Sequence, residues 1–402
     1  MERSDYRTVT AVAMTAGTLA ANPLETAMRH GSPHHFLIAL LFVTGLAADE
    51  VRPQPKLPGI EVAILIDTSS SMDGLIDQAR AQLWATVNQL AATTRDGRSP
   101  SLRVALYEYG NSRLAAGDGW IRQVRPLDDD LDALSEALFS LRTSGGNEFC
   151  GQVLARAISD LAWHEGDHYR AIFIAGNEPF TQGSFAYADA CRAAVAKGIV
   201  INTIHCGRAA DGLAGGWLDG ARLGGGSGLN IEQHLVEVAI AAPQDARLGQ
   251  LNGEFNATYL AYGMDGAQAQ ARQGEQDANA SSNGSFSARA GAKASGYYRN
   301  SAWDLVDAVQ EKRIDPATIP RDELPEALRG LDAQALAQVI AAKAAERARL
   351  RAEMVALSAA REAFLAATQK EKAGAQPVGA TFGGALRQAL AGQMAAKGYR
   401  LR

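Results

Sequence analysis

A short run of oxygen-bearing side chains follows a strongly apolar stretch of the chain. Residues 60–67, IEVAILID, have the composition of a buried β-strand and end in Asp67. Two hydroxyl residues, Ser69 and Ser71, follow at alternate positions, and a helix-like sequence begins directly after them. A carboxylate and two hydroxyls in one turn can bind a hard divalent cation, because Mg²⁺ and Ca²⁺ prefer oxygen ligands. The spacing therefore predicts a cation site, with simple helix capping by these side chains as the alternative.

The elements that position this turn alternate between short apolar runs and amphipathic helical stretches. Near-continuous apolar strands are typical of a sheet buried on both faces. The alternation predicts an α/β fold, Rossmann-like, with a mostly parallel sheet and helices on both faces. Ligands bind such sheets at the carboxyl ends of the strands, where Asp67 falls. A short turn between the second and third runs predicts one antiparallel edge strand. The expected strands are 60–67, 102–110, 120–127, 169–176 and 199–207, and the expected helices are 74–94, 129–141, 150–163 and 184–198.

The chain changes character near residue 241. Strand signals fade and Ala, Gln, Glu and Arg dominate, which predicts an α/β domain over 58–240 and an α-helical C-terminal domain over 241–402. A long helix is predicted at about 332–370, where apolar residues recur at three-four spacing. This stripe favours packing against its own domain over a coiled-coil seam, and arginines such as Arg347 and Arg351 are expected on the other sides. Further helices are expected at 244–263, 301–312 and 383–397.

Four segments of the α/β part resemble the von Willebrand factor type A (vWA) domain. The resemblance covers about residues 58–240 and implies the Rossmann-like fold already expected. It also implies a role in recognition rather than catalysis. Members with an intact metal-ion-dependent adhesion site (MIDAS) hold a divalent cation, and an acidic residue of a partner completes the coordination of that cation. The four segments are AILIDTSSSM (63–72), SGGNEFCGQVLARAI (144–158), AIFIAGNEPF (171–180) and KGIVINTIHCG (197–207).

The match to the family's adhesion site is partial. The Asp-x-Ser-x-Ser motif is matched by Asp67, Ser69 and Ser71. The family's Gly-Gly-Thr-Asp is replaced by residues 145–148, GGNE, and its Thr-Asp-Gly-Glu by residues 175–178, AGNE.

These departures make the expected site degenerate. Asn147 stands where the family has threonine, and Gly176 stands where it has aspartate, while Glu178 keeps a nearby acid. Losing one carboxylate lowers the negative charge of the site, and Glu178 or Glu148 is expected to compensate. What the resemblance implies is a Mg²⁺ or Ca²⁺ site without an organic cofactor. Its expected ligands are Asp67, Ser69, Ser71, Asn147 and Glu178.

The loops around this site are the expected contact surface for a protein partner. The partner-contacting residues are predicted to include Ser70, Met72, Gly146, Glu148 and Asn177. Two other functions stay open at this point. One is a hydrolase or other enzyme with a polar site within 245–305, including Gln276, Asp277 and Asn279, for which the vWA domain is a docking module. The other is a structural envelope protein whose metal site binds nothing.

The N-terminus has the layout of a targeting segment. Residues 36–48, FLIALLFVTGLAA, are 13 apolar residues that follow basic residues and end in small ones. This run is too short for a membrane span, which takes about 20 residues, and it predicts a secretory signal peptide at about 28–47. Residues 1–47 are then an extension plus signal peptide, and 48–57 a proline-containing linker. The predicted location is secreted or periplasmic, without a membrane anchor after cleavage; a buried N-terminal helix is the alternative.

Export places the three cysteines in an oxidising compartment, which predicts one disulfide and one free thiol. Cys191–Cys206 and Cys150–Cys206 are the favoured pairings, and sequence alone does not choose between them. The alternative is three buried, inert thiols.

Other features weaken competing functions. A net charge of −5 over 402 residues argues against a nucleic-acid binder, which would show a basic surplus. Residues 164–168, HEGDH, formally match the zinc-protease motif, but Gly and Asp interrupt the helix that this motif needs, so a turn is predicted. The acidic residues within 128–132 are expected to cap a helix N-terminus rather than bind calcium.

Overall fold

The computed structural model of the protein describes residues 58–231, 240–372 and 382–401. The predicted N-terminal extension, signal peptide and linker over 1–57 lie outside these residues. Within the described ranges, none of the helices combines the length and the apolar character needed to cross a membrane.

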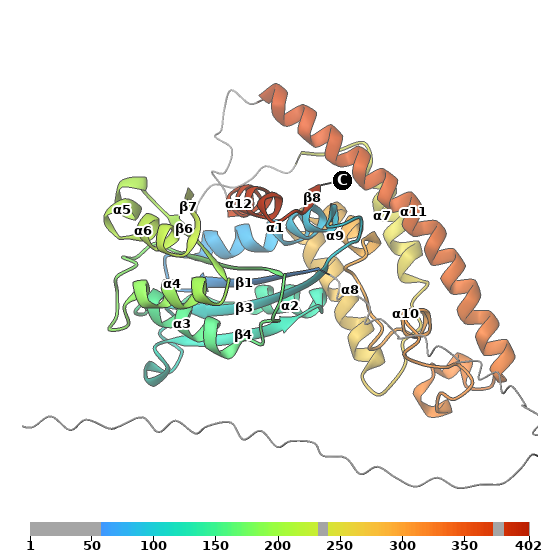
Figure 1. The fold of residues 1–402 in the computed structure, drawn as a ribbon. Coiled ribbons are helices and arrows are strands. Elements are labelled where there is room, and N and C mark those ends of the chain that lie inside the picture. Colours follow the sequence, from blue (N-terminus) through green and yellow to red (C-terminus); the bar gives the residue numbers. More distant parts are fainter. Residues whose placement is uncertain (1–57, 232–239, 373–381, 402) are drawn as a thin grey trace, which may run out of the picture. The chain divides into compact units, whose positions relative to one another are not determined.

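A six-stranded sheet forms the centre of the first part of the chain (Figure 1). Its strands are β1 (Gly59–Asp67), β3 (Ser101–Tyr109), β4 (Ile121–Asp128), β5 (Tyr169–Gly176), β6 (Val200–Cys206) and β7 (Gly225–Ile231). They lie in the order β4-β3-β1-β5-β6-β7, and every neighbouring pair is parallel except the β3–β4 pair. The predicted Rossmann-like fold with one antiparallel edge strand is confirmed.

Alternating side chains send the strands' apolar residues to both faces of this sheet. Ile60, Val62, Ile64 and Ile66 of β1 belong to one buried cluster, and Ala63 with Leu65 to the other. This is the period-two pattern of a strand that is buried on both sides. The first cluster is covered by α1 (Asp73–Ala91) and α2 (Leu131–Ser140), and the second by α3 (Cys150–Asp160), α4 (Tyr187–Ala196) and α6 (Trp217–Leu223). The short helix α5 (Ala209–Ala214) precedes α6.

The end of the chain packs on this sheet. Helix α12 (Phe382–Ala396) contacts α1, β6 and β7. The short strand β8 (Arg400–Leu401) pairs antiparallel with β2 (Thr93–Thr94), which follows α1. Tyr399 Oη donates to the carbonyl of Gly59 at 2.8 Å, and Tyr169 Oη donates to Gln393 Oε1 at 2.6 Å. Residues 382–401 therefore share a core with the vWA-like part, although the predicted boundary at residue 240 places them in a separate helical domain.

Residues 240–372 lie between β7 and α12 and are helical as predicted. Their helices are α7 (Asp245–Asn256), α8 (Gly266–Ser282), α9 (Phe286–Ala294), α10 (Leu305–Gln310) and α11 (Ala333–Lys372), with short 3₁₀ turns at Arg321–Glu323 and Glu326–Leu328. Helix α7 ends before the predicted Gly263, because the next backbone groups bond elsewhere. Leu260 N–H donates to Asp304 Oδ1 at 2.8 Å, and Tyr262 N–H donates to the Trp303 carbonyl at 2.8 Å.

The long helix α11 packs on its own chain, against α7, α9 and α10, as its apolar stripe predicted. Leu336, Ile340, Leu350 and Met354 are all buried. The expectation that Arg347 faces solvent was wrong, since only 1% of this residue is exposed and its guanidinium pairs with acids of α10 and its N-cap.

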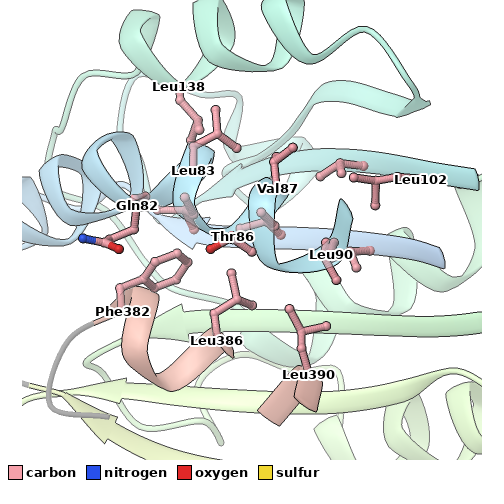
Figure 2. Close-up of a pocket in the computed structure, with 15 residues that line it drawn as sticks. Gln82, Leu83, Thr86, Val87, Leu90, Leu102, Leu138, Phe382, Leu386 and Leu390 are labelled. Carbon is pink, nitrogen blue, oxygen red and sulfur yellow. The ribbon is translucent and has the colours of Figure 1, made fainter. Parts of the chain in front are cut away.

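The packing between α1 and α12 leaves a small apolar cavity of about 30 Å³. Figure 2 shows Phe382, Leu386 and Leu390 of the last helix facing Leu83 and Leu90 of α1. The space is close to that of one water molecule and its lining is apolar, so we interpret it as a packing defect and not as a ligand site.

Truncating Leu386 tests how much this last helix stabilises the sheet. Leu386 is 3% exposed, and we expect Leu386→Ala to lower the free energy of unfolding by about 2–5 kcal/mol, since it enlarges a cavity in the core. Chemical denaturation of the full chain measures the change. The matched control is Leu213→Ala at a residue that is 66% exposed, for which the expected change stays within about 0.5 kcal/mol. Equal effects of the two variants would contradict the packing described.

Candidate functional site

The candidate site lies at the carboxyl end of β1, where Asp67 is the last strand residue. Asp67 is fully buried, and its Oδ1 accepts the N–H of Ser69 at 2.7 Å. Thr68 joins this loop to the end of β3. Its N–H donates to the Tyr109 carbonyl at 2.9 Å, and its hydroxyl donates to Glu108 at 3.2 Å. This local turn presents the following serines to the end of the sheet before α1 begins.

The hydroxyl groups of this loop lie close together. Ser69 Oγ and Ser71 Oγ lie 3.2 Å apart. Asn177, from the loop after β5, donates from its Nδ2 to Ser71 Oγ at 3.1 Å. The structure therefore brings Asp67, Ser69, Ser71 and Asn177 together at one edge of the sheet. Ser70 and Ser71 are exposed at the rim of this group.

A second carboxyl group, that of Glu148, lies inside the site. Glu148 is only 4% exposed and hydrogen-bonds with Asp67 and Ser69. Burial raises the pKa of Asp67 to about 6. Burial, reinforced by the charge of Asp67, raises the pKa of Glu148 to about 9. The two groups share a proton at neutral pH unless a cation takes its place. The prediction that Glu148 contacts a partner is wrong, because its side chain is covered.

Three predicted residues lie differently. Asn147 and Glu178 are exposed, and no hydrogen bond of their side chains joins them to Asp67 or to the serines. Glu178 acts on the site through its charge, which contributes to the raised pKa of Asp67 after the larger effect of burial. Met72 is fully buried in the core under α1, so its predicted contact with a partner is wrong.

Glycines let the loops approach closely enough to form the site. Gly110 has φ +78°, and a Cβ there would lie 2.7 Å from Glu148 Cγ and 2.8 Å from Asp67 Oδ1. A Cβ on Gly146 would lie 2.4 Å from the Gly110 carbonyl oxygen. A side chain at Gly110 would therefore meet Glu148 and Asp67 directly, and one at Gly146 would separate its loop from that of Gly110.

A side chain at Gly176 has no room beside Tyr109. A Cβ on Gly176 would lie 2.5 Å from Tyr109 Oη. That hydroxyl is buried and donates to the Ala175 carbonyl at 3.0 Å. Tyr109 thus occupies the space next to Asp67 that an aspartate at position 176 would need.

The donor set fits a hard divalent cation. Asp67 Oδ2 and Asn177 Oδ1 are buried, and neither accepts an N–H or alcohol O–H from any residue that the structure describes. Together with the serine hydroxyls and Glu148, the ligands on offer are all oxygens, as Mg²⁺ and Ca²⁺ prefer. Over 58–231, 240–372 and 382–401, no three histidine, cysteine, aspartate or glutamate side chains gather to hold a metal. A cation here would depend on two carboxyls plus hydroxyl and amide oxygens.

The three cysteines are free and buried, so the predicted disulfide was wrong. The sheet itself separates the expected partners. Cys206 belongs to the cluster on one face, while Cys150 and Cys191 belong to the cluster on the other. Cys150 and Cys191 also do not pair with each other, since Cys150 Sγ contacts Tyr109 Oη at 3.8 Å and Cys191 Sγ contacts the Gly220 carbonyl at 3.4 Å.

The polar residues of α8 form an ion network between helices. Asp277 Oδ1 accepts from Arg289 Nε at 2.5 Å, and its Oδ2 lies 3.0 Å from Lys293 Nζ. Arg289 also pairs with Asp132 of α2 at 2.7 Å, and it is fully buried. Gln276 Oε1 accepts from Ser135 Oγ of α2 at 2.8 Å. These side chains therefore hold α8 and α9 against α2, which is the role expected of structural polar groups.

The remaining motifs singled out in the sequence make local contacts. The HEGDH segment is a loop before β5, and His164 Nδ1 lies 2.6 Å from Glu61 Oε1. Asp130 caps α2 by accepting from the Ala133 N–H at 2.9 Å.

Comparison with known proteins agrees with this fold. Residues 61–212 match the family model described as von Willebrand factor type A domain. No curated protein matches the chain.

Solved structures that resemble the chain cover less than half of it. BatB from Bacteroides thetaiotaomicron is 17% identical to this chain. The match spans 43% of this chain and 91% of the BatB chain, with a TM-score of 0.33. The SpRpn10 VWA domain is 16% identical, covers 44% and 89%, and has a TM-score of 0.34. Proximal thread matrix protein 1 from the mussel byssus, solved with a zinc-occupied MIDAS motif, is 13% identical, covers 38% and 37%, and has a TM-score of 0.29.

A double-mutant cycle tests the steric link between Gly176 and Tyr109. We expect Gly176→Ala to lower the free energy of unfolding by about 1–3 kcal/mol, because the new methyl group overlaps the tyrosine hydroxyl. Tyr109→Phe removes that hydroxyl, so the double variant is expected to lose less than the two single variants together, with a coupling energy of about 0.5–3 kcal/mol. Denaturant titrations of all four proteins give this coupling. Additive losses would show that the hydroxyl does not set the residue type at position 176.

Substitution of Asp277 tests the buried network. We expect Asp277→Asn to lower the free energy of unfolding by about 3–5 kcal/mol at neutral pH, since it leaves buried Lys293 without a carboxylate and removes one of the two carboxylates of Arg289. Burial alone would raise the pKa of Asp277, but the charges of Lys293 and Arg289 outweigh burial and hold this pKa below its ordinary value. The contribution of Asp277 is therefore present above its ordinary pKa of 3.8 and is lost as the pH falls below it.

The measurement is the difference in unfolding free energy between wild type and Asp277→Asn at a series of pH values. It should shrink as the pH falls from about 5 towards 2. The control is Asp189→Asn, at a residue that forms an exposed pair with Arg192. A pH-independent difference would contradict the role given to the Asp277 charge.

Proposed function

Because residues 61–212 form a von Willebrand factor type A domain, we propose that this chain is an exported interaction protein. It binds a protein partner at the loops around Asp67, and a divalent cation held there takes part in the contact. The carrying observation is the pair of buried carboxyl groups, Asp67 and Glu148, beside the hydroxyls of Ser69 and Ser71.

The charge of this pair supports a cation. Two carboxyl groups removed from water cannot both ionise without a neutralising charge. No arginine or lysine pairs with Asp67 or Glu148 among the ion pairs of the described residues. A divalent cation bound by Asp67 and Glu148, with Ser69, Ser71 and Asn177 as further oxygen ligands, would supply that charge. When bound, it would act as a Lewis acid that attracts a carboxylate of the partner.

The surroundings suit a protein contact. Ser70, Gly146, Asn147 and Glu178 are exposed on the loops that lead out from the sheet's carboxyl edge. Two large apolar side chains on connections from the same edge are also exposed, Phe185 after β5 at 45% and Leu213 after β6 at 66%. Polar rim residues with a few exposed apolar side chains are typical of a protein-binding surface.

The enzyme alternative has less support. The polar residues proposed for it, Gln276, Asp277 and Asn279, bond to one another or to neighbouring helices. The structural alternative differs from the proposal only in whether the site binds anything, so an experiment separates them. Export rests on the predicted signal peptide at about 28–47 and is tested by N-terminal sequencing of the protein from the culture medium or the cell envelope.

Cation binding is measured directly by calorimetric titration of the chain with Mg²⁺ and with Ca²⁺. We expect a single site with a Kd of about 10⁻⁴–10⁻³ M, the range of extracellular calcium modules. Asp67→Asn should abolish binding, and Glu148→Gln should weaken it about tenfold or more, because each removes a buried charged ligand. Glu178→Gln is the control, since this exposed residue should change affinity much less.

Partner binding is measured by capture from an envelope extract with wild type, with wild type in EDTA, and with Asp67→Asn. A partner that is retained by wild type and lost in both other samples supports the proposal. Absence of both cation binding and such a partner favours the structural alternative, whereas cation binding without such a partner contradicts the role given to the cation in the contact. Unchanged cation affinity in Asp67→Asn, with melting curves showing an intact fold, overturns the cation site.

A further inference from the structure

A second cavity, lined by polar residues, lies in the helical region between α10, α11 and the connection that follows α9. Its volume is about 160 Å³. A protein cavity of about 150 Å³ accommodates benzene, so this space can hold a ligand of about six to ten non-hydrogen atoms. Its charged lining residues are Arg299, Asp307, Glu311 and Arg351.

Arg351 is the unusual member of this lining. Its Nε is buried and has no hydrogen-bond partner within the described part of the chain. The guanidinium lies over the ring of Phe255, at 5.8 Å from the ring centre. The buried arginines nearby are paired, Arg347 with Asp304 and Arg289 with Asp132. A covered donor without an acceptor costs free energy, so Arg351 lacks an anionic or acceptor group at this point.

The two acids of the cavity do not supply that group. Asp307 Oδ1 accepts from Arg347 at 2.7 Å, and its Oδ2 accepts the N–H of Asn300 at 3.0 Å. Glu311 pairs with Arg313 at 3.2 Å. Each acid therefore pairs with a cation other than Arg351, and Arg347 is shared between Asp307 and Asp304.

The second arginine adds positive charge on the open side. Arg299 is exposed, and its Nε donates to the Gly296 carbonyl at 2.9 Å. Arg299 thus adds a second guanidinium to the lining, whose two acids pair with arginines other than Arg299 and Arg351.

We propose that this cavity binds a small oxyanion, a carboxylate or phosphate group carried on at most about ten non-hydrogen atoms. Arg351 is the fixed recognition residue, because a guanidinium presents two parallel N–H donors that match the oxygens of either group. Arg299 contacts the ligand from the exposed side of the cavity. Neither arginine belongs to the cation site at Asp67. The inference is independent of the proposed interaction function.

The test titrates the full chain separately with sodium phosphate and sodium acetate, against sodium chloride at equal ionic strength. Binding is followed by calorimetry and by the NMR signals of the arginine Nε–H groups. We expect saturable binding of at least one probe at one site, and which probe binds identifies the carboxylate or the phosphate source. If neither probe shows saturable binding, the proposal is overturned.

Matched variants locate the binding. Arg351→Met should weaken it about tenfold or more, and Arg351→Lys should weaken it less, because lysine keeps the charge but not the paired donors. Arg349→Met is the control, on the same helix, exposed and paired with Glu346 at 2.8 Å, and it should leave binding unchanged. Equal losses in the Arg349 and Arg351 variants would show a general charge effect and overturn the site. Arg351→Lys keeps the test decisive if the methionine variant does not fold.

Discussion

A sheet of this kind is stable only when both of its apolar faces are covered, and this chain covers one face with its last helix. Phe382, Leu386 and Leu390 of α12 pack on α1 over the even-numbered residues of β1. The pairing of β8 with β2 and the hydrogen bond from Tyr399 to Gly59 fix the end of the chain beside its first described strand. Covering this face therefore uses residues more than 300 positions from the first strand, which is a high-contact-order arrangement.

This constraint explains why the intervening helices are held by buried charges. Residues 240–372 leave the sheet after β7 and return at α12, so they must pack beside it. The contact with α2 buries Arg289 and Lys293 with Asp132 and Asp277, and a second network buries Arg347 with Asp304 and Asp307. Buried ions are tolerable only when each is paired. The helices can thus meet in few other registers without leaving a charge unpaired.

Local patterns were sufficient to predict the elements of the fold. The alternating and three-four apolar patterns placed the strands and most helices within a few residues, because those signals arise from short stretches of chain. Arg347 was assigned to the wrong side of α11, since its partners Asp304 and Asp307 are 43 and 40 residues away and only their proximity makes an arginine tolerable in the core. Packing of α12 on the sheet and the separation of Cys206 from Cys191 depend on the assembled sheet, which no local pattern encodes.

The candidate site shows the same limit at the level of single atoms. Spacing predicted that Asp67, Ser69 and Ser71 share a turn, because that depends on neighbouring residues. It did not predict that Tyr109 fills the space beside Gly176, or that Gly110 and Gly146 let Glu148 reach Asp67. Position 176 offers no carboxyl, while Glu148 reaches Asp67 from the loop before α3. The number of buried carboxyls at the site is therefore two, although the motif alone counts one. Volume rather than motif identity decides which loop can provide the second carboxyl, because a side chain at Gly176 and the hydroxyl of Tyr109 cannot occupy the same space.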